Sequence, residues 1–331
     1  MAVWVAPGLG AVGGGKFDGV MGVVIALEVF RCAPEAPLEL VIFAEEEGTT
    51  FGLGMLGSRS WAGEISVAEL DKLKNRHGES YLEAGRPHGV SADCMRDDLL
   101  DPSAYRGMIE VHAEQGLGLW SDGLPVGVVT RINGRREFAL RFGGQGNHAG
   151  STRMGQRRDA LAGSAEAVLA VEALGRRLDA EREHSVMTVG CIGVRPNAVN
   201  VIPGVAELRV DFRAQDERVL ADGEERLRAE LSEIARKRTL ELSITKNEQV
   251  PPSPLDADLR MRLVEAAAAL GYTMPERPSG ALHDAARLAG HMPAGMLFVA
   301  SRDGISHDPR EFSRSEDIAL AAEIVLETIR R

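Results

Sequence analysis

The fold of this chain is decided by residues 38–48, which read LELVIFAEEEG. The apolar run Leu40–Ala44 is too short for a helix and is typical of a buried strand in a mostly parallel sheet. A parallel strand delivers its carboxyl end to the crevice in which α/β proteins bind ligands. The three carboxylates at that end, Glu45, Glu46 and Glu47, repel one another unless a cation or a shared proton holds them. A ligand site is one interpretation of this acidic run, and a solvated helix face is the other.

Composition excludes several classes of protein. A chain of 331 residues can build a full hydrophobic core in one large or two ordinary domains. Its net charge of −11, with dispersed basic residues, argues against nucleic acid as a partner. It has no apolar run of the roughly 18 residues that a membrane span needs. The three cysteines, Cys32, Cys94 and Cys191, are odd in number and widely spaced, which predicts a reduced, cytoplasmic protein. The first residues contain no basic region, so no secretion signal is expected.

The pattern toward both ends of the chain is α/β. Helices and strands are expected there at 20–32, 40–44, 55–61, 108–112, 256–270 and 296–299. Ser313 and Glu316 have capping-box spacing and are expected to introduce a terminal helix. Residues 1–15 show neither helical nor strand periodicity, and we expect them to form an unstructured entry to the domain.

The middle of the chain has a different character. Strands are expected at 137–142, 186–192, 206–213 and 240–245, and amphipathic helices at 159–178 and 216–236. This βαββαβ order predicts a small α+β domain with an antiparallel sheet and two helices on one face. We therefore expect a domain at 130–246 that interrupts a catalytic domain made of residues 1–129 and 247–331.

Five acids and imidazoles outside the inserted domain lie at loop or strand-end positions, and such a set suits a divalent metal. They are Asp18, Glu46, Glu47, His112 and His283. No two of them have the spacing of a zinc finger or of a His-Glu-x-x-His helix, so an ordinary surface or core residue is the alternative for each histidine. That ordinary interpretation is kept for His77, His88, His184 and His291.

Six motifs occur in an order that resembles a known family. They are GGKFDG at 14–19, AEEEGxxFG at 44–52, VHAEQG at 111–116, NHAG at 147–150, NVIPG at 200–204 and SGxxHD at 279–284. Together they resemble the hydantoinase/carbamoylase branch of the M20 metallopeptidase-like amidohydrolases, over residues 13–331. The resemblance implies an α/β di-metal catalytic domain with a mixed sheet, interrupted by a lid domain through which the protein forms a homodimer.

Carried over by position, the resemblance assigns roles to the metal-site residues. It makes Asp18 a carboxylate that bridges two metal ions, with Glu47 and His283 completing one site and His112 serving the other. Glu46 would be the general base that takes a proton from the attacking water. The two ions would be zinc or manganese, with cobalt and nickel as alternatives.

The same resemblance assigns the substrate contacts. His148, in the lid, would reach the site of the partner subunit and polarise the substrate carbonyl. Asn200 and Arg213 would bind the substrate carboxylate, although a solvated strand charge is the alternative for Arg213. Gln115, Gly304 and Ser306 are further substrate-binding candidates, and His307 is left undecided.

The resemblance implies metal-dependent hydrolysis of a linear amide. The expected substrate is the carbamoyl or ureido group of an N-carbamoyl-L-amino acid or of an allantoate-like acid, with release of ammonia and carbon dioxide. An aminoacylase or dipeptidase of the same family is one alternative. An inactive remnant or binding protein is another, and the number of metal ions per chain separates it from an enzyme.

One stretch departs from the family pattern. The family has GSHLD shortly before GGKFDG, and its histidine is a metal ligand, whereas Val5–Leu9 here reads VAPGL. Read one nucleotide later, the codons for Trp4–Val12 permit GSHLDSVP. We therefore expect residues 1–13 to be an out-of-frame reading and the catalytic domain to be N-terminally incomplete. A gene sequence whose shifted frame does not encode GSHLD would refute this hypothesis.

Overall fold

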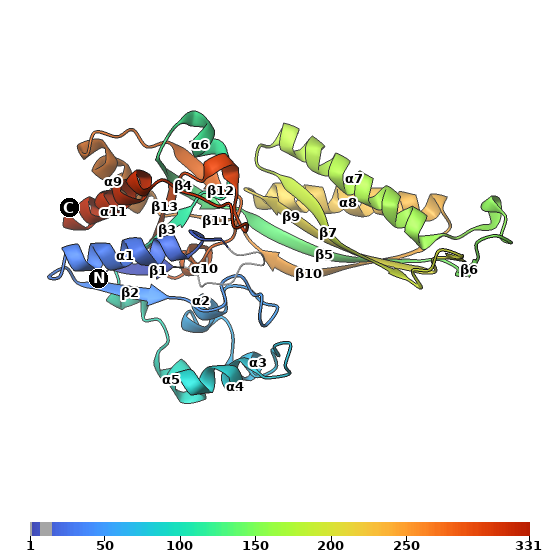
Figure 1. Cartoon of the computed structure of the whole chain (residues 1–331), viewed down its shortest axis with the longest axis horizontal. Helices are drawn as coiled ribbons and strands as arrows, with labels where there is room; N and C mark the ends of the chain where they lie inside the picture. The colour runs from blue at the N-terminus through green and yellow to red at the C-terminus, as the bar shows by residue number, and fades with distance from the viewer. Residues whose placement is uncertain (1, 7–14) are drawn as a thin grey trace. The chain divides into compact units, whose positions relative to one another are not determined.

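The computed structural model describes the backbone of residues 2–6 and all of residues 15–331 (Figure 1). It divides into two compact units, one made of residues 1–132 and 253–331 and the other of residues 133–252. The sequence placed the junctions after residues 129 and 246. Strand β4 (Val126–Ile132) and strand β10 (Glu241–Val250) both continue past those points, so each junction falls slightly later in the chain.

The first unit is built on a mixed sheet. Strands β2, β1, β3 and β13 are parallel neighbours, β4 runs antiparallel to β13, and β11 and β12 both pair with β4. Their bounds are β1 Ala2–Ala6, β2 Leu38–Ile42, β3 Gly107–Ala113, β11 Ser253–Pro254, β12 Glu276–Ser279 and β13 Ala294–Val299. The mixed α/β architecture is the one the sequence predicted.

The expectation of an unstructured start is wrong for Ala2–Ala6. This segment forms β1, a central strand whose backbone pairs in parallel with β2 on one side and β3 on the other. A central parallel strand is covered on both faces and reads as a continuous apolar run, so the absence of alternation was no evidence against it. Residues 7–14, which hold most of the VAPGL departure, lie outside the described residues.

Helices cover both faces of this sheet. On one face, α1 (Val20–Cys32), α9 (Ala257–Ala269) and α11 (Ser315–Arg330) pack onto the strands and share a core that includes Ile25 and Val111. On the other face, Phe43 and Phe298 belong to a second core beside α10 (Asp284–Leu288) and α2 (Leu56–Trp61). The remaining short helices of this unit are α3 (Val67–Leu70), α4 (Tyr81–Gly85), α5 (Ala92–Asp97) and α6 (Gly118–Asp122).

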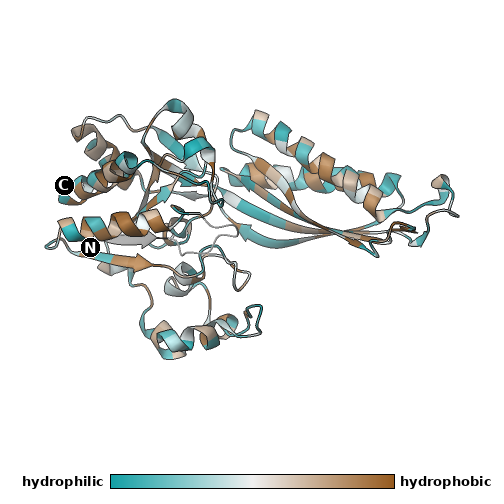
Figure 2. Cartoon of the chain, viewed as in Figure 1, coloured by the Kyte–Doolittle hydropathy of each residue, from teal (hydrophilic) through white to brown (hydrophobic). Residues whose placement is uncertain are grey.

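The second unit has the predicted βαββαβ order and an antiparallel sheet in the order β10-β5-β9-β7. Its other elements are β5 Gly134–Gly143, α7 Ala160–Glu181, β7 Val186–Arg195, β9 Val205–Ala214 and α8 Glu217–Lys237. Both helices carry hydrophobic and hydrophilic residues along their lengths (Figure 2), and their apolar sides pack on one face of the sheet against residues such as Phe138 and Phe212. The short strands β6 (Asn147–His148) and β8 (Val201–Ile202) pair separately.

No helix in the described part of the chain is both long enough and apolar enough to cross a membrane.

Candidate metal and catalytic site

The chemistry-bearing residues of the first unit gather at the carboxyl ends of its parallel strands. Asp18 lies in the turn between β1 and α1, Glu46 and Glu47 follow β2, His112 is near the end of β3, and His307 lies in the loop after β13. Parallel strands that end at one edge of a sheet bring their following loops together there. The topology therefore collects residues that are far apart in the sequence.

Asp18 is the centre of this group. Its Oδ1 lies 3.0 Å from His112 Nε2, and its Oδ2 lies 2.9 Å from His307 Nε2. Gln115 Nε2 also donates a hydrogen bond to Oδ2, at 2.9 Å. Burial alone would raise the pKa of Asp18, but the hydrogen bond and charge of His112, with the nearby His307, lower it to about 2. The carboxylate is therefore ionised and has an imidazole against each oxygen.

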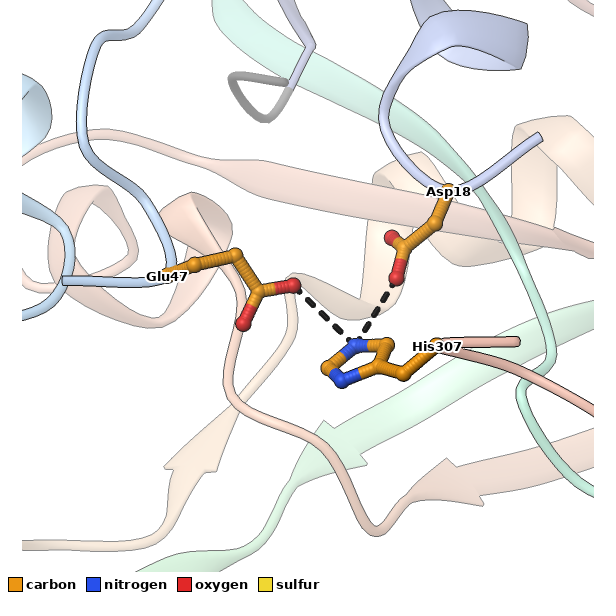
Figure 3. A group of neighbouring side chains, drawn as sticks. All are labelled: Asp18, Glu47 and His307. Atoms are coloured by element: carbon orange, nitrogen blue, oxygen red, sulfur yellow. Dashed lines mark ion pairs between the residues drawn. The ribbon is translucent and has the colours of Figure 1, made fainter. Parts of the chain in front are cut away.

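Glu47 completes a group of three on one side of Asp18 (Figure 3). Its Oε1 lies 3.1 Å from His307 Nε2, and one ligand atom from each of Asp18, Glu47 and His307 lies within 4.8 Å of the other two. Asp18 is buried, whereas the side chain of His307 is 42% exposed, so the group opens toward solvent. Two carboxylates and one imidazole form a donor set that suits a divalent metal ion.

His112 faces the opposite oxygen of Asp18 with its orientation fixed. Its Nδ1 donates a hydrogen bond to the Ala113 carbonyl oxygen at 2.8 Å, which leaves Nε2 directed at Asp18. A metal-ligating histidine is usually held in this way by a hydrogen bond at its second nitrogen. Burial lowers the pKa of His112, but the hydrogen bond and charge of Asp18 outweigh it and raise the pKa to about 9.

The contacts of His283 differ from the grouping expected from the sequence, since they include Ser279, Glu110 and His112. His283 is buried just before α10, with Nε2 2.8 Å from Ser279 Oγ and Nδ1 3.9 Å from Glu110 Oε1. Its ring packs edge-on against His112, with the ring centroids 4.6 Å apart. His307, which sequence reasoning left undecided, lies beside Glu47 instead.

Glu46 is half-buried, and its pKa is raised well above the ordinary value. Burial is the main cause, and the negative charges of Asp284, Glu47 and Glu110 add to it. Its neighbour Glu45 has a different role, because the Glu45 carboxylate accepts hydrogen bonds from Thr50 N at 3.1 Å and Phe51 N at 3.3 Å. The acidic run thus divides into a residue that holds the loop (Glu45), an acid of raised pKa (Glu46) and a ligand candidate (Glu47).

Two further buried acids escaped the sequence reasoning. Glu110 accepts a hydrogen bond from Ala285 N at 2.8 Å, and Asp284 accepts one from Ser58 Oγ at 2.5 Å. Burial raises the pKa of both carboxyls, and for Glu110 the charge of Asp284 adds to the effect. A signal for Glu110 was present in the sequence, because it interrupts the apolar run of β3.

The loops around the site are held in left-handed backbone conformations. Glu45, Gln115, Asp303 and His307 have φ between 55° and 57°, which is uncommon for residues other than glycine. Gly304 has φ of 67°, and a Cβ there would lie only 2.9 Å from Leu117 N. Such strain persists where the surrounding structure enforces it, and it concentrates at functional sites. Ser306 Oγ, on the same loop, lies 3.4 Å from Asp18 Oδ2.

In the second unit, the candidate His148 lies at the end of β6. His148 Nδ1 accepts hydrogen bonds from Gly150 N at 3.1 Å and Ser151 N at 3.2 Å, so the neutral ring carries its proton on Nε2. The pairing of β6 with β8 and a hydrogen bond from Ala149 N to the Asn200 carbonyl oxygen at 2.9 Å join the NHAG and NVIPG motifs.

Arg213 is held on its own strand. Its Nε lies 2.8 Å from Asp211 Oδ1, within an array of ion pairs on one face of the sheet. Its binding of a substrate carboxylate and its alternative as a solvated strand charge both stay predictions.

Known proteins resemble the chain over nearly its full length. The model of peptidase family M20/M25/M40 matches residues 9–331. The N-carbamoyl-L-amino acid amidohydrolase of Geobacillus stearothermophilus is 35% identical over 322 residues, which cover 96% of this chain and 78% of that one. The ureidoglycolate hydrolase of Arabidopsis thaliana is 36% identical over 328 residues, covering 95% and 68% of the two chains.

Solved structures also resemble the chain over nearly its full length. The crystal structure of AtUAH in complex with glyoxylate superposes with a TM-score of 0.87 at 33% identity, covering 99% of this chain and 80% of that one. An amidase of the hydantoinase/carbamoylase family from Burkholderia multivorans gives a TM-score of 0.84 at 34% identity, with the same coverage. The chain therefore belongs to peptidase family M20/M25/M40, and within it to the hydantoinase/carbamoylase amidohydrolases, enzymes that act on linear amides.

Proposed function

We propose that this protein hydrolyses the carbamoyl or ureido group of a small ureido acid, such as an N-carbamoyl-L-amino acid or an allantoate-like acid, at a metal site centred on Asp18. The observation that carries the proposal is the two-sided environment of the Asp18 carboxylate, with His112 against one oxygen and His307 against the other. Relatives named for carbamoyl amino acids, allantoate and ureidoglycolate support the substrate class.

The donor set fits a divalent ion, zinc or manganese in this proposal. Asp18, Glu47 and His307 would hold one ion, and Asp18 with His112 would hold a second. His307 replaces His283 as the proposed ligand, because Nε2 of His283 faces Ser279. When bound, such an ion lowers the pKa of a water molecule and polarises a carbonyl group.

Glu46 would act as the general base and accept a proton from the attacking water on its carboxylate. A base works best when its pKa lies near the working pH, and burial among other acids moves the pKa of Glu46 in that direction. Its neighbour Glu47 is a proposed ligand, so the base would lie beside the reacting water. The neighbouring carboxyl groups of Asp284, Glu47 and Glu110 also raise the pKa of Glu46, which favours its protonated form after transfer.

Residues of the second unit would bind and polarise the substrate. His148 presents Nε2–H as a donor, because backbone N–H groups occupy Nδ1, and this donor would stabilise charge that develops on the carbonyl oxygen. Asn200 and Arg213 would bind the substrate carboxylate, with Arg213 leaving Asp211 to do so. We place Gln115, Gly304 and Ser306 near the substrate and propose a homodimer through the second unit.

The test compares two adjacent carboxylates. Purified protein is loaded with Mn²⁺ or Zn²⁺ and assayed against N-carbamoyl-L-amino acids, allantoate, N-acetylamino acids and dipeptides, with metal content measured in parallel. Glu46→Gln should keep its metal and lose about 10²- to 10⁴-fold in kcat, the usual contribution of a general base. Glu45→Gln, the control, should stay near wild type.

Each other outcome has a distinct meaning. Hydrolysis of only acetylamino acids or dipeptides would move the function to the aminoacylase alternative. Fewer than two ions per chain and no turnover would favour the inactive remnant, and unchanged turnover in Glu46→Gln would remove Glu46 from the mechanism.

A further inference from the structure

Glu311 is a buried carboxylate next to the metal site that has no role in the proposed chemistry. It is 1% exposed and closes a turn in which Glu311 N donates to the Asp308 carbonyl oxygen at 2.9 Å. Its Oε2 accepts hydrogen bonds from Phe17 N at 2.7 Å and Asp18 N at 3.0 Å. Its Oε1 accepts one from Ser306 Oγ at 2.8 Å. One carboxylate thus joins the loop that carries Asp18 to the loop that carries His307.

The surroundings of Glu311 are shaped for this contact. A Cβ on Gly15 would lie 2.5 Å from Glu311 Oε2, so only a glycine lets the backbone pass this close. The rings of Phe17 and Phe312 pack edge-on with centroids 5.9 Å apart and hold the two segments together beside the carboxylate. Polar and apolar contacts therefore fix the same pair of loops.

A purely structural role accounts poorly for this arrangement. Among the described residues, no arginine, lysine or histidine forms an ion pair with Glu311, and burying an unpaired carboxylate costs stability. The N–H groups that it binds precede the first turn of α1, which begins at Val20 after Gly19, so Glu311 is not a cap of that helix. Its hydrogen bonds instead fix the position of Asp18.

We propose that Glu311 is a positioning residue that holds Asp18 and the Ser306–His307 loop in the geometry that the metal requires. The inference rests on the proposed metal site. Three hydrogen bonds to one carboxyl group, two from the Asp18 loop and one from the His307 loop, suit the task of keeping the two ligand loops in register. Partners that orient metal ligands in this way are worth about 10- to 100-fold in metal affinity.

The experiment measures Co²⁺ binding to the full chain through the visible absorption of the bound ion. Glu311→Ala should weaken Co²⁺ binding about 10- to 100-fold and alter the spectrum, because Asp18 and His307 lose their fixed positions. Glu311→Gln should rescue both, since the amide oxygen still accepts from Phe17 N and Asp18 N and the amide nitrogen can donate to Ser306 Oγ. Asp317→Asn, which changes another buried acid of this unit, should bind Co²⁺ like wild type.

Two results would overturn the assignment. The first is a Co²⁺ affinity of Glu311→Ala that matches wild type. The second is a Co²⁺ affinity of Glu311→Gln as low as that of Glu311→Ala, which would indicate that only the charge is needed. Hydrogen exchange in EDTA separates this inference from the proposed function. Faster exchange confined to residues 15–20 and 304–308 in Glu311→Ala would uphold the positioning role even if wild type bound no metal. Unchanged exchange in those segments would contradict it.

Discussion

The two units of this protein hold their charges in opposite ways. On the sheet of the second unit, Arg135 lies within 2.6 to 3.3 Å of three carboxylates, those of Asp211, Glu248 and Glu137. Burial of Asp211 would raise its pKa, but Arg213 and Arg135 outweigh it and lower the pKa. We call these residues, with Arg213, the ion-pair network. Its charges compensate one another within the chain.

The first unit has no such balance at its strand ends. We define the acid cluster as Asp18, Glu46, Glu47, Glu110 and Asp284. Its members form ion pairs with imidazoles: His112 and His307 at Asp18, His307 at Glu47 and His283 at Glu110. Three of these acids have raised pKa values, the opposite of Asp211. The second unit therefore pairs its charges within the chain, whereas the acid cluster is, in our proposal, arranged to hold a cation.

Metal binding should have the largest effect on stability, and it should act through the first unit. An ion that binds the folded state at 100 times its Kd adds about 2.7 kcal/mol to the free energy of unfolding. Urea denaturation with EDTA and with Mn²⁺ or Zn²⁺ measures the difference. Arg135→Met, which disrupts the ion-pair network, should lower stability equally with and without metal. Equal stability of wild type in both conditions would mean that the acid cluster holds no ion.

The pH dependence of the metal-free protein should also come from the first unit. Burial raises the pKa of Glu110 and Asp284, so the folded state keeps protons that the unfolded state releases, and this stabilisation falls as pH rises. His112, with its pKa raised to about 9, stabilises the folded state below its unfolded pKa and loses that effect as pH rises through about 9. Asp18, with a pKa of about 2, loses its contribution only in acid.

The free energy of unfolding in EDTA should therefore decrease from about pH 5 to about pH 9. Denaturation in urea at several pH values gives the slope directly, and Glu110→Gln should make it shallower while keeping the hydrogen bond from Ala285 N. A flat or rising profile would show that the acid cluster does not retain protons.

The smallest effect concerns the His148 turn of the second unit. A Cβ at Gly150 would lie 3.2 Å from His148 Cε1, so Gly150→Ala should displace the ring and lower kcat about tenfold, less than the roughly 10²-fold that a 1 Å misplacement can cost. Metal content should not change. Gly155→Ala is the matched control, because a Cβ there meets no atom within 4 Å. Equal kcat in the two variants would argue against a role for the His148 ring.

Local patterns were enough to predict much of the fold. The bounds of α1 and the βαββαβ order followed from hydrophobic periodicity, because each element buries one face. Periodicity failed for β1, a central parallel strand. The capping-box expectation at Ser313 was also wrong, since α11 begins at Ser315 and Arg314 takes the N-cap position without a side-chain cap. Such ends depend on tertiary contacts that the spacing does not encode.

Sequence patterns also identified only some residues of the candidate site. Strand-end position identified Asp18, Glu47 and His112 as ligand candidates, but it could not rank His283 against His307, because both follow strands of the same sheet. Their difference is orientation: Nε2 of His283 faces Ser279, whereas Nε2 of His307 faces Asp18 and Glu47. Glu311 was missed because its contacts with Phe17 and Asp18 lie almost 300 positions away along the chain.

The most direct test of the account is the metal content of two histidine variants, His307→Ala and His283→Ala, with circular dichroism to confirm folding. We expect His307→Ala to lose the ion held with Asp18 and Glu47, and His283→Ala to keep it. His283→Gln, which can retain a hydrogen bond to Ser279, serves if the alanine variant does not fold. Loss of that ion from the folded His283 variant, and its retention by His307→Ala, would contradict the proposed site.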